Sequence, residues 1–270
     1  MKAGGGQISV FSFQFSAIGN CKLITPTLDH MVHMAAPGDD GAKLEPKRLS
    51  FAAGEDTLSA LLLARGEPRA LYVYGHGAGA GMEHAFMEAS AQDLARRGIA
   101  TFRYNFPYTE LKRGAPDRTH VLLRTVRAAV SAAADALPGV PLLAGGKSMG
   151  GRMTSEAQAK EPLPGVRGLI FVGFPLHRPK NVNTDRAAHL ASVHLPMLFL
   201  QGTRDEMADL ELMRGVAEGL GARATLHVVE GADHGFHVLK RSGRTDGEVM
   251  NELTERIERW IHDVVPVQSR

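Results

Sequence analysis

Short apolar runs alternate with stretches of helical periodicity along most of the chain. A first pair of runs, at residues 48–53 and 58–64, flanks the turn sequence Gly-Glu-Asp and predicts an antiparallel hairpin. Further runs of strand length follow, separated by segments in which apolar residues recur every three or four positions. This alternation is typical of an α/β fold with a mostly parallel sheet and helices on both faces. The predicted parallel strands lie at residues 70–75, 99–104, 141–146, 168–174, 196–202 and 224–231.

Two of the predicted helices show a clear apolar stripe. Apolar side chains recur at helical spacing over residues 122–137, where a Pro-Gly pair ends the pattern, and again over residues 249–264. Both stripes are interpreted as faces that pack against the sheet. No internal repeat or linker interrupts residues 41–265, so this range is predicted to be one domain.

The two ends of the chain differ from its middle. An apolar run at residues 8–19 is interrupted by serine and glutamine, and no small-residue cleavage site follows it, which argues against a signal peptide. Residues 1–40 are predicted to be an extension that is disordered or precedes a true start at Met31 or Met34. Export through this segment remains the alternative to a cytoplasmic location. Residues 266–270 are predicted to be a tail.

Composition and charge limit the classes of partner. Of the 270 residues, 44% are hydrophobic and 22% are charged, as in ordinary globular proteins. The 31 basic and 29 acidic residues give a formal charge of +2, which predicts neither a nucleic-acid surface nor a membrane surface. The single cysteine, Cys21, excludes an internal disulfide and a multi-cysteine zinc site and is compatible with a reducing compartment. We expect a small-molecule substrate in the cytoplasm, with no metal and no cofactor.

The stretch LLAGGKSMGGR, residues 142–152, contains two overlapping motifs. Its Gly-Lys-Ser resembles the end of a phosphate-binding P-loop, whereas Gly146 to Gly150 fit the G-x-S-x-G nucleophile elbow. A P-loop needs glycine where this chain has Pro141, which has no N–H to donate to a phosphate. The elbow agrees with its context, because a predicted strand leads into Ser148 and a predicted helix follows it. The sequence therefore favours nucleophilic attack by Ser148 over nucleotide binding.

Partners for a nucleophilic serine follow later predicted strands. In this architecture the acid and the base come after the serine along the chain. Asp205 follows the penultimate predicted strand and His234 follows the last one, so both are expected at the carboxyl edge of the sheet. Glu206 and Asp209 are alternatives for the acid, and Asp205 is preferred because it comes first after its strand. The predicted catalytic residues are Ser148, Asp205 and His234.

A glycine-rich loop, YGHGAGAGMEH, follows the first predicted parallel strand. We expect the backbone N–H groups of Ala78 and Met149 to form an oxyanion hole, with Gly77 and Gly79 as alternatives to Ala78. The same glycines could begin a dinucleotide-binding fingerprint. That function is disfavoured because the next predicted strand ends in Arg-Tyr-Asn and supplies no acidic ligand for a ribose.

Six motifs occur in one order along the chain: YGHGAGAGMEHAFM, FRYNFPYTE, GGKSMGGRM, GFPLHRPK, LFLQGTRDEM and GADHGF. Together they resemble the small α/β-hydrolases described as predicted or dienelactone-hydrolase-like hydrolases, over residues 47–263. The resemblance implies an α/β-hydrolase fold with Ser148, Asp205 and His234 as nucleophile, acid and base. Animal relatives include a testis-expressed protein and a histone acetyltransferase subunit thought to act without catalysis. Dienelactone hydrolases carry a cysteine nucleophile, so Ser148 argues against a lactone substrate.

Many proteins of this fold insert a lid in the segment that corresponds to residues 175–195. Here that segment has room for one short helix, which predicts a shallow, open pocket for a small, soluble acyl substrate. The side chains expected around this pocket are His76, Gly79, Phe106, Pro107, Tyr108, Pro175, Leu176 and His177.

The resulting hypothesis is a serine hydrolase that transfers an acyl group from an ester or thioester to water. Two rivals remain, a noncatalytic scaffold with the same fold and a peptidase or acyltransferase with the same triad. A Ser–Lys dyad with Lys147 is disfavoured because adjacent side chains diverge at a sharp turn. We expect Lys147 to bury its stem or to pair with a carboxylate.

Overall fold

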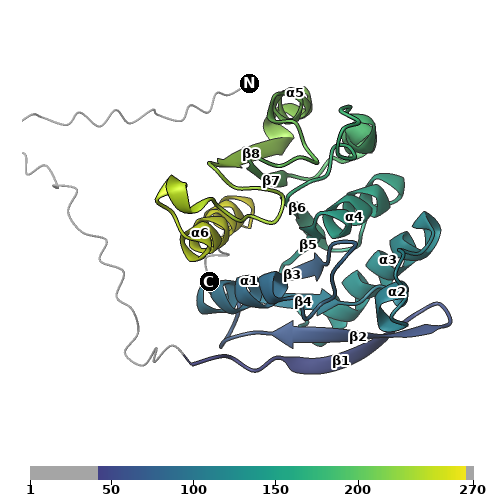
Figure 1. The fold of residues 1–270 in the computed structure, drawn as a ribbon. Helices are drawn as coiled ribbons and strands as arrows, with labels where there is room; N and C mark the ends of the chain where they lie inside the picture. The colour runs from purple at the N-terminus through teal and green to yellow at the C-terminus, as the bar shows by residue number, and fades with distance from the viewer. Residues whose placement is uncertain (1–41, 266–270) are drawn as a thin grey trace, which may run out of the picture. The chain divides into compact units, whose positions relative to one another are not determined.

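One sheet of eight strands lies at the centre of the computed structural model, which describes residues 42–265 (Figure 1). The predictions made for residues 1–40 and 266–270, including those on Cys21, lie outside this range. The strand order is β1-β2-β4-β3-β5-β6-β7-β8. The strands are β1 (Lys47–Ala53), β2 (Asp56–Leu63), β3 (Ala70–Gly75), β4 (Ile99–Tyr104), β5 (Leu142–Lys147), β6 (Val166–Val172), β7 (Met197–Gly202) and β8 (Ala224–Val229).

The pairing of the strands confirms the predicted α/β fold. β1 and β2 form the antiparallel hairpin, β2 pairs with β4 antiparallel, and all other pairs are parallel. The order reverses at β3, which lies between β4 and β5. Gly75 at the end of β3 is paired with Gly146 near the end of β5, so the loops that follow these strands start side by side. In open α/β sheets, such a reversal is where ligands bind.

Helices cover both faces of the sheet, each over its own apolar cluster. Alternating side chains of β3 show the division, because Leu71 and Val73 belong to one cluster and Tyr72 and Tyr74 to the other. The face of Tyr72 packs against α1 (Ala85–Arg96) and α6 (Asp246–Val264). The opposite face packs against α3 (Thr119–Ala136), α4 (Met149–Lys160) and α5 (Leu210–Leu220). The two predicted apolar stripes are thus core faces of α3 and α6.

Short helical turns complete the described chain. They are α2 (Pro107–Glu110), η1 (Asp185–Ser192), η2 (Gly221–Arg223) and η3 (Lys240–Ser242). Only η1 lies in the segment between β6 and β7 where a lid was considered, and it is a 3₁₀ helix of eight residues. Within residues 42–265 no helix is long and apolar enough to cross a membrane.

Candidate active site

Ser148 lies in a strained turn between β5 and α4. Its φ of 49° and ψ of −115° are a conformation that non-glycine residues rarely adopt. The neighbouring glycines allow this turn to lie against the loop after β3. A Cβ on Gly146 or on Gly150 would lie 2.4 or 2.3 Å from the carbonyl oxygen of Gly75, closer than any real contact. Both positions therefore require glycine, and the strained turn has the geometry of a nucleophile elbow.

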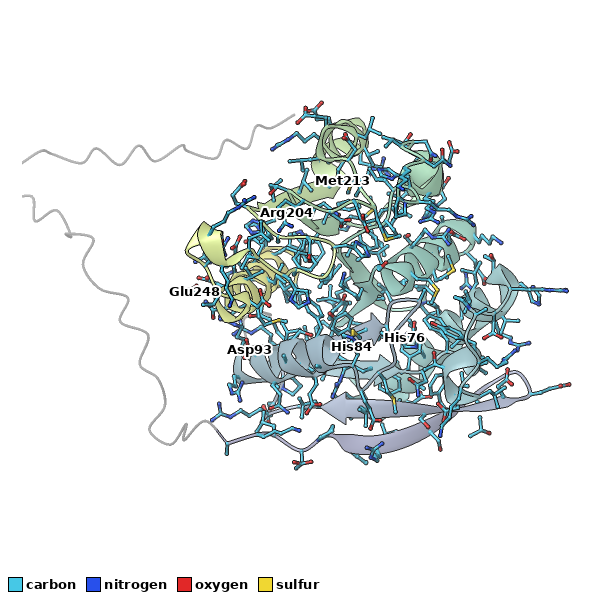
Figure 2. The ribbon with its side chains drawn as sticks, in the orientation of Figure 1. His76, His84, Asp93, Arg204, Met213 and Glu248 are labelled. Carbon is cyan, nitrogen blue, oxygen red and sulfur yellow. The ribbon has the colours of Figure 1, made fainter. Side chains whose placement is uncertain are left out.

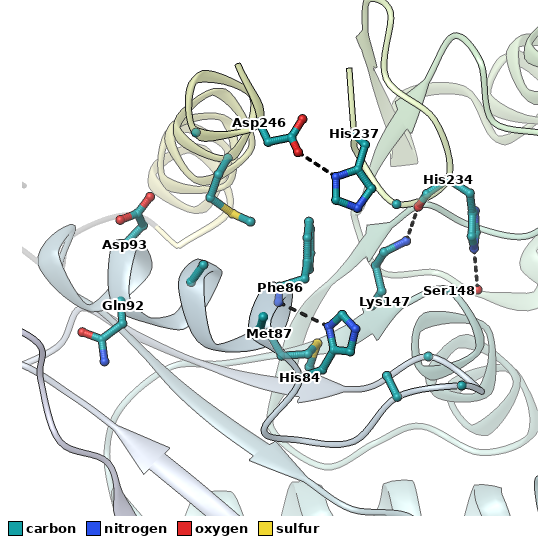
Figure 3. A pocket seen from close by; sticks show the side chains of 18 of the residues that line it. His84, Phe86, Met87, Gln92, Asp93, Lys147, Ser148, His234, His237 and Asp246 are labelled. Atoms are coloured by element: carbon teal, nitrogen blue, oxygen red, sulfur yellow. Dashed lines mark hydrogen bonds and ion pairs between the residues drawn. The ribbon is translucent and has the colours of Figure 1, made fainter. Parts of the chain in front are cut away.

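The structure brings Ser148, His234 and Asp205 into one chain of hydrogen bonds. His234 Nδ1 lies 2.7 Å from Asp205 Oδ2, and His234 Nε2 lies 2.9 Å from Ser148 Oγ. The carboxylate can only accept, so Nδ1 carries the proton and donates it to Asp205. Nε2 is then free to accept from the Ser148 hydroxyl. Figure 3 shows His234 directed at Ser148 from the loop after β8.

Asp205 is fixed by further donors. Gln201 Nε2 donates to Oδ2 at 2.5 Å, and the backbone N–H of Met207 donates to Oδ1 at 2.8 Å. The Asp205 side chain has no solvent exposure, whereas that of His234 is 23% exposed. The acid is therefore enclosed and rigid, and the base remains accessible to a substrate.

The alternative acids occupy other positions. Asp209 caps the first turn of α5, where its Oδ1 accepts from the N–H of Leu212 at 3.0 Å. Glu206 is exposed to solvent. Within the described chain, Asp205 is the carboxylate that contacts His234.

Backbone donors surround the nucleophile. Met149 is the first residue of α4, and a Cβ on Gly77 would lie 3.7 Å from Ser148 Cβ, which places the glycine-rich loop beside the elbow. Among residues 42–265, no acceptor pairs with the N–H of Ala78 or Met149. The N–H groups of Gly77 and Gly79 are likewise without an acceptor there. Several donors are therefore free beside Ser148.

The predicted pocket residues His76, Phe106 and Tyr108 lie beneath this loop and outside the lining of the cavity. His76 Nδ1 lies 2.8 Å from the Gly77 carbonyl oxygen, and its Nε2 accepts from the Phe106 N–H at 3.3 Å. Burial lowers the pKa of His76 to about 4, so the ring is neutral and Nδ1 carries its one proton. Since C=O and N–H point in opposite directions across a trans peptide, a Gly77 carbonyl held by His76 turns the Ala78 N–H outward.

Pro175, Leu176 and His177 are also corrected by the structure. All three are buried and do not line the cavity beside Ser148. His177 Nδ1 lies 2.9 Å from the Arg178 carbonyl oxygen, and its Nε2 accepts from the Asp209 N–H at 3.0 Å. Its ring thus ties the segment after β6 to the start of α5. Of the predicted pocket residues, Gly79 lines the cavity and the others do not.

A cavity of about 940 Å³ lies beside Ser148 (Figure 3). Its walls are the glycine-rich loop, α1, the elbow, the loop that carries His234 and the first turn of α6. Two of these walls can be located in Figure 2 by its labels: His84 marks the start of α1, and Glu248 marks the first turn of α6. Helices α1 and α6 build much of this cavity, and the segment between β6 and β7 does not line it.

Comparison with known families agrees with this geometry. A family model for the alpha/beta hydrolase domain matches residues 68–262. The chain belongs to the alpha/beta hydrolase family. Membership of the family supports hydrolase activity.

Solved structures share the fold of this hydrolase. A dienelactone hydrolase from Anabaena variabilis is 17% identical, with 83% of this chain and 100% of that chain covered and a TM-score of 0.65. A lidless α/β serine hydrolase from Xanthomonas campestris is 20% identical, with 83% and 97% covered and a TM-score of 0.63. Est1E from Butyrivibrio proteoclasticus, solved with ferulic acid bound, is 16% identical, with 80% and 99% covered and a TM-score of 0.64.

Several residues that hold the site in place were not among the predicted site residues. Arg103 Nη1 donates to the Met82 carbonyl at 3.0 Å, and Asn105 Oδ1 accepts from the Met82 N–H at 3.0 Å. Both come from the end of β4 and fix the glycine-rich loop from below. Gln201 supports Asp205 in the same way. Their positions at the carboxyl ends of predicted strands were the available signal, because polar side chains there face the site.

Lys147 reaches from the elbow to the loop that carries His234 (Figure 3). Its Nζ donates to the backbone carbonyl of His234 at 2.5 Å and lies 5.2 and 5.8 Å from the ring centroids of Phe236 and Phe86. Burial lowers the pKa of the amine to about 8, against two nearby carboxylates that raise it. Lys147 is therefore buried, as one of the two expectations had it, and its partner is a carbonyl oxygen in place of the carboxylate of the other.

Lys147→Met is expected to alter the pH dependence of stability. The amine has a pKa of about 8 when folded, against 10.5 as its ordinary value, so burying the ammonium disfavours folding below about pH 8. Between pH 8 and 10.5 the Lys147 amine is deprotonated in the folded protein but still protonated in the unfolded chain, so the stability of the wild type rises with pH. By about pH 9.5 its free energy of unfolding has increased by about 1–2 kcal/mol. The methionine variant lacks this gain. Urea unfolding at neutral pH and at about pH 9.5 measures it; parallel pH dependence in both proteins would contradict the buried amine.

Tyr108→Phe is expected to lower kcat about tenfold with little change in KM, because it loosens the loop without removing an oxyanion donor. The Tyr108 hydroxyl donates to the Ala78 carbonyl at 2.8 Å. Steady-state kinetics on an activated ester measures both constants. Tyr74→Phe is the matched control, since its hydroxyl contacts Ser90 under α1. Equal kinetics for Tyr108→Phe and wild type would show that the hydroxyl does not position the loop.

Proposed function

We propose that the protein is a serine hydrolase that cleaves an ester or thioester of a small acyl group through an acyl-enzyme on Ser148. The observation that supports this most is the relay from Asp205 through His234 to a serine on a strained turn. A relay of this kind raises the nucleophilicity of a hydroxyl that is otherwise a weak nucleophile. Membership of the alpha/beta hydrolase family supports the same class of chemistry.

In the first half of the reaction, His234 Nε2 takes the hydroxyl proton as Ser148 Oγ attacks the carbonyl carbon. Asp205 holds the ring and stabilises the imidazolium that forms. The tetrahedral intermediate then collapses. Its bond to the leaving oxygen or sulfur breaks, and His234 returns the proton to that atom, which leaves the acyl group on Ser148.

In the second half, water takes the place of the departed alcohol or thiol. His234 removes a proton from the water as its oxygen attacks the acyl carbon, and returns that proton to Ser148 Oγ when the ester bond breaks. The products are a carboxylic acid and the original enzyme. No cofactor is needed for this sequence of steps.

The oxyanion of each intermediate is assigned to the N–H groups of Ala78 and Met149. Donors already in place at the site of developing charge need no reorganisation during the reaction. Met149 also opens α4, where the helix dipole favours negative charge. His76 and Tyr108 act on the loop that carries Ala78 and are positioning residues.

A panel of substrates tests this proposal. Purified protein is incubated with p-nitrophenyl esters, an acyl thioester and an anilide that carry the same acyl groups. We expect turnover of the esters and the thioester and little turnover of the anilide. Turnover of the anilide in preference would indicate a peptidase. If none of the three classes is hydrolysed faster than the uncatalysed rate, the result would instead favour a noncatalytic scaffold.

A further inference from the structure

The cavity beside Ser148 continues as a groove between α1 and α6, the α1–α6 groove (Figure 3). Its walls carry unusually small side chains. Ala85 and Ala89 are exposed on one face of α1, and Gly247 lines the groove from the first turn of α6. A passage therefore remains open where larger side chains would close it.

Most of the groove's surface is apolar, although His84, Gln92, His237 and Asp246 also line it. Phe86 and Met87 line it from α1, Met250 from α6 and Met207 close to the nucleophile. Methionine side chains are flexible and adapt to the shape of an apolar group. The groove thus offers a surface that removes hydrocarbon from water.

The groove has a polar far end. Figure 3 shows Phe86 between Ser148 on one side and Asp93 on the other. Asp93 forms an ion pair of 3.1 Å with Arg96, and both line the cavity. Phe86 and Asp93 are two turns of α1 apart, which is about 10 Å along the helix. The apolar part of the groove therefore ends about 10 Å from Phe86 at the polar pair.

We propose that the α1–α6 groove binds the acyl group of the substrate, and that this group is an unbranched apolar chain of about eight carbons or more. An extended chain advances about 1.3 Å per carbon, so the stretch between Phe86 and the polar pair alone holds about eight carbons. The inference rests on the proposed function and names the substrate class of the same site.

The acyl group fits the groove better than the alcohol for a mechanistic reason. The alcohol leaves before water attacks, whereas the acyl group stays on Ser148 through both halves of the reaction. An apolar groove that shields its ligand from water therefore suits the acyl group better than the alcohol. The Gly77–Ala80 loop, which carries the donors for the acyl oxygen, leads directly into α1 and its side of the groove.

Two series of esters test the assignment. In the acyl series the leaving group is p-nitrophenol and the acid varies from acetate to decanoate. In the alcohol series the acid is acetate and the alcohol varies from ethanol to octanol. Each fully buried methylene changes kcat/KM by up to about fourfold. We expect kcat/KM to rise at least about tenfold from acetate to octanoate and to vary little in the alcohol series.

Variants that fill the groove separate its role from that of the catalytic residues. Ala89→Trp adds a large side chain at an exposed position of α1. Gly247→Leu fills the groove from α6, where an added Cβ would have only Thr245 Oγ1 within 4 Å, at 3.9 Å. Both variants are expected to lower kcat/KM for octanoate at least about tenfold and for acetate less than about threefold. Ser131→Trp, exposed on α3 across the sheet, is the control and should change neither.

The outcomes keep the groove and the proposed function apart. Hydrolysis that is fastest for acetate, with the same effect of both variants on every ester, would overturn the groove assignment and leave the serine hydrolase intact. Chain-length dependence in the alcohol series alone would overturn the acyl assignment. Hydrolysis of no ester in either series would overturn the proposed function itself. If Ala89→Trp fails to fold, Gly247→Leu decides between these outcomes.

Discussion

Ser148→Ala is expected to lower kcat for ester hydrolysis by up to about 10⁶-fold. The variant removes the oxygen that forms the acyl-enzyme, so His234 is left without a proton to take. Substrate binding and the oxyanion donors are retained, so the variant should still hydrolyse the ester about 10³-fold faster than the uncatalysed reaction in water. Alanine keeps the Cβ already present at this strained position, so the melting temperature should change little. Steady-state kinetics and a thermal melt measure both effects.

Ser155→Ala is the matched control for this variant. Ser155 also contacts a histidine, with its Oγ 2.7 Å from His189 Nε2, but it does not line the cavity. Burial lowers the pKa of His189 to about 4, so this pair is a buried neutral contact. Ser155→Ala should retain full activity per folded molecule. Retained activity in Ser148→Ala, or its loss in Ser155→Ala alone, would contradict the assignment of the nucleophile.

Asp205→Asn is expected to lower kcat by about 10⁴-fold while the protein stays folded. The Met207 N–H requires an oxygen at the position of Oδ1, which turns the amide NH₂ of the asparagine toward His234. The Gln201 amide, which donates to Oδ2 in the wild type, must then turn its oxygen toward this NH₂. A donor at this point forces the proton of the histidine from Nδ1 to Nε2. Nε2 then cannot accept from Ser148, and the base is lost although its position is unchanged.

Asp209→Asn supplies the control for the acid. Asparagine is as good a helix cap as aspartate, so both the stability of α5 and the activity should be retained. Kinetics for the two variants, measured on the same ester, decide the assignment. A loss of less than about tenfold in Asp205→Asn, far below the loss of a tautomer-fixing acid, would assign that role to another residue.

Much of the fold could be predicted from the sequence because local patterns determine it. The hairpin and the order of strands and helices follow from apolar runs of strand length and from helical stripes between them. Observed boundaries differ little, as in the strand predicted at 141–146 and found at Leu142–Lys147. The elbow was predictable for a related reason, because Gly146 and Gly150 are required by backbone contacts that recur wherever this turn is built.

The lining of the pocket could not be predicted in the same way. The sequence shows which residues follow a strand but not which side of the loop each side chain occupies. His76 and Tyr108 follow β3 and β4 as expected, yet they point under the glycine-rich loop and hold its carbonyls. The contact of Lys147 with the His234 carbonyl joins residues far apart in the chain and depends on tertiary packing. The groove likewise depends on the spacing of α1 and α6.

The most direct test of the central claim is the site of a covalent adduct. The native protein is treated with a fluorophosphonate, which reacts with activated serines, then digested and examined by peptide mass spectrometry. The relay predicts one adduct, on Ser148, in the peptide that begins after Lys147, with no labelling of Ser148→Ala and slow labelling of Asp205→Asn. Labelling of a different residue, or no labelling of the folded wild-type protein, would contradict a nucleophilic Ser148.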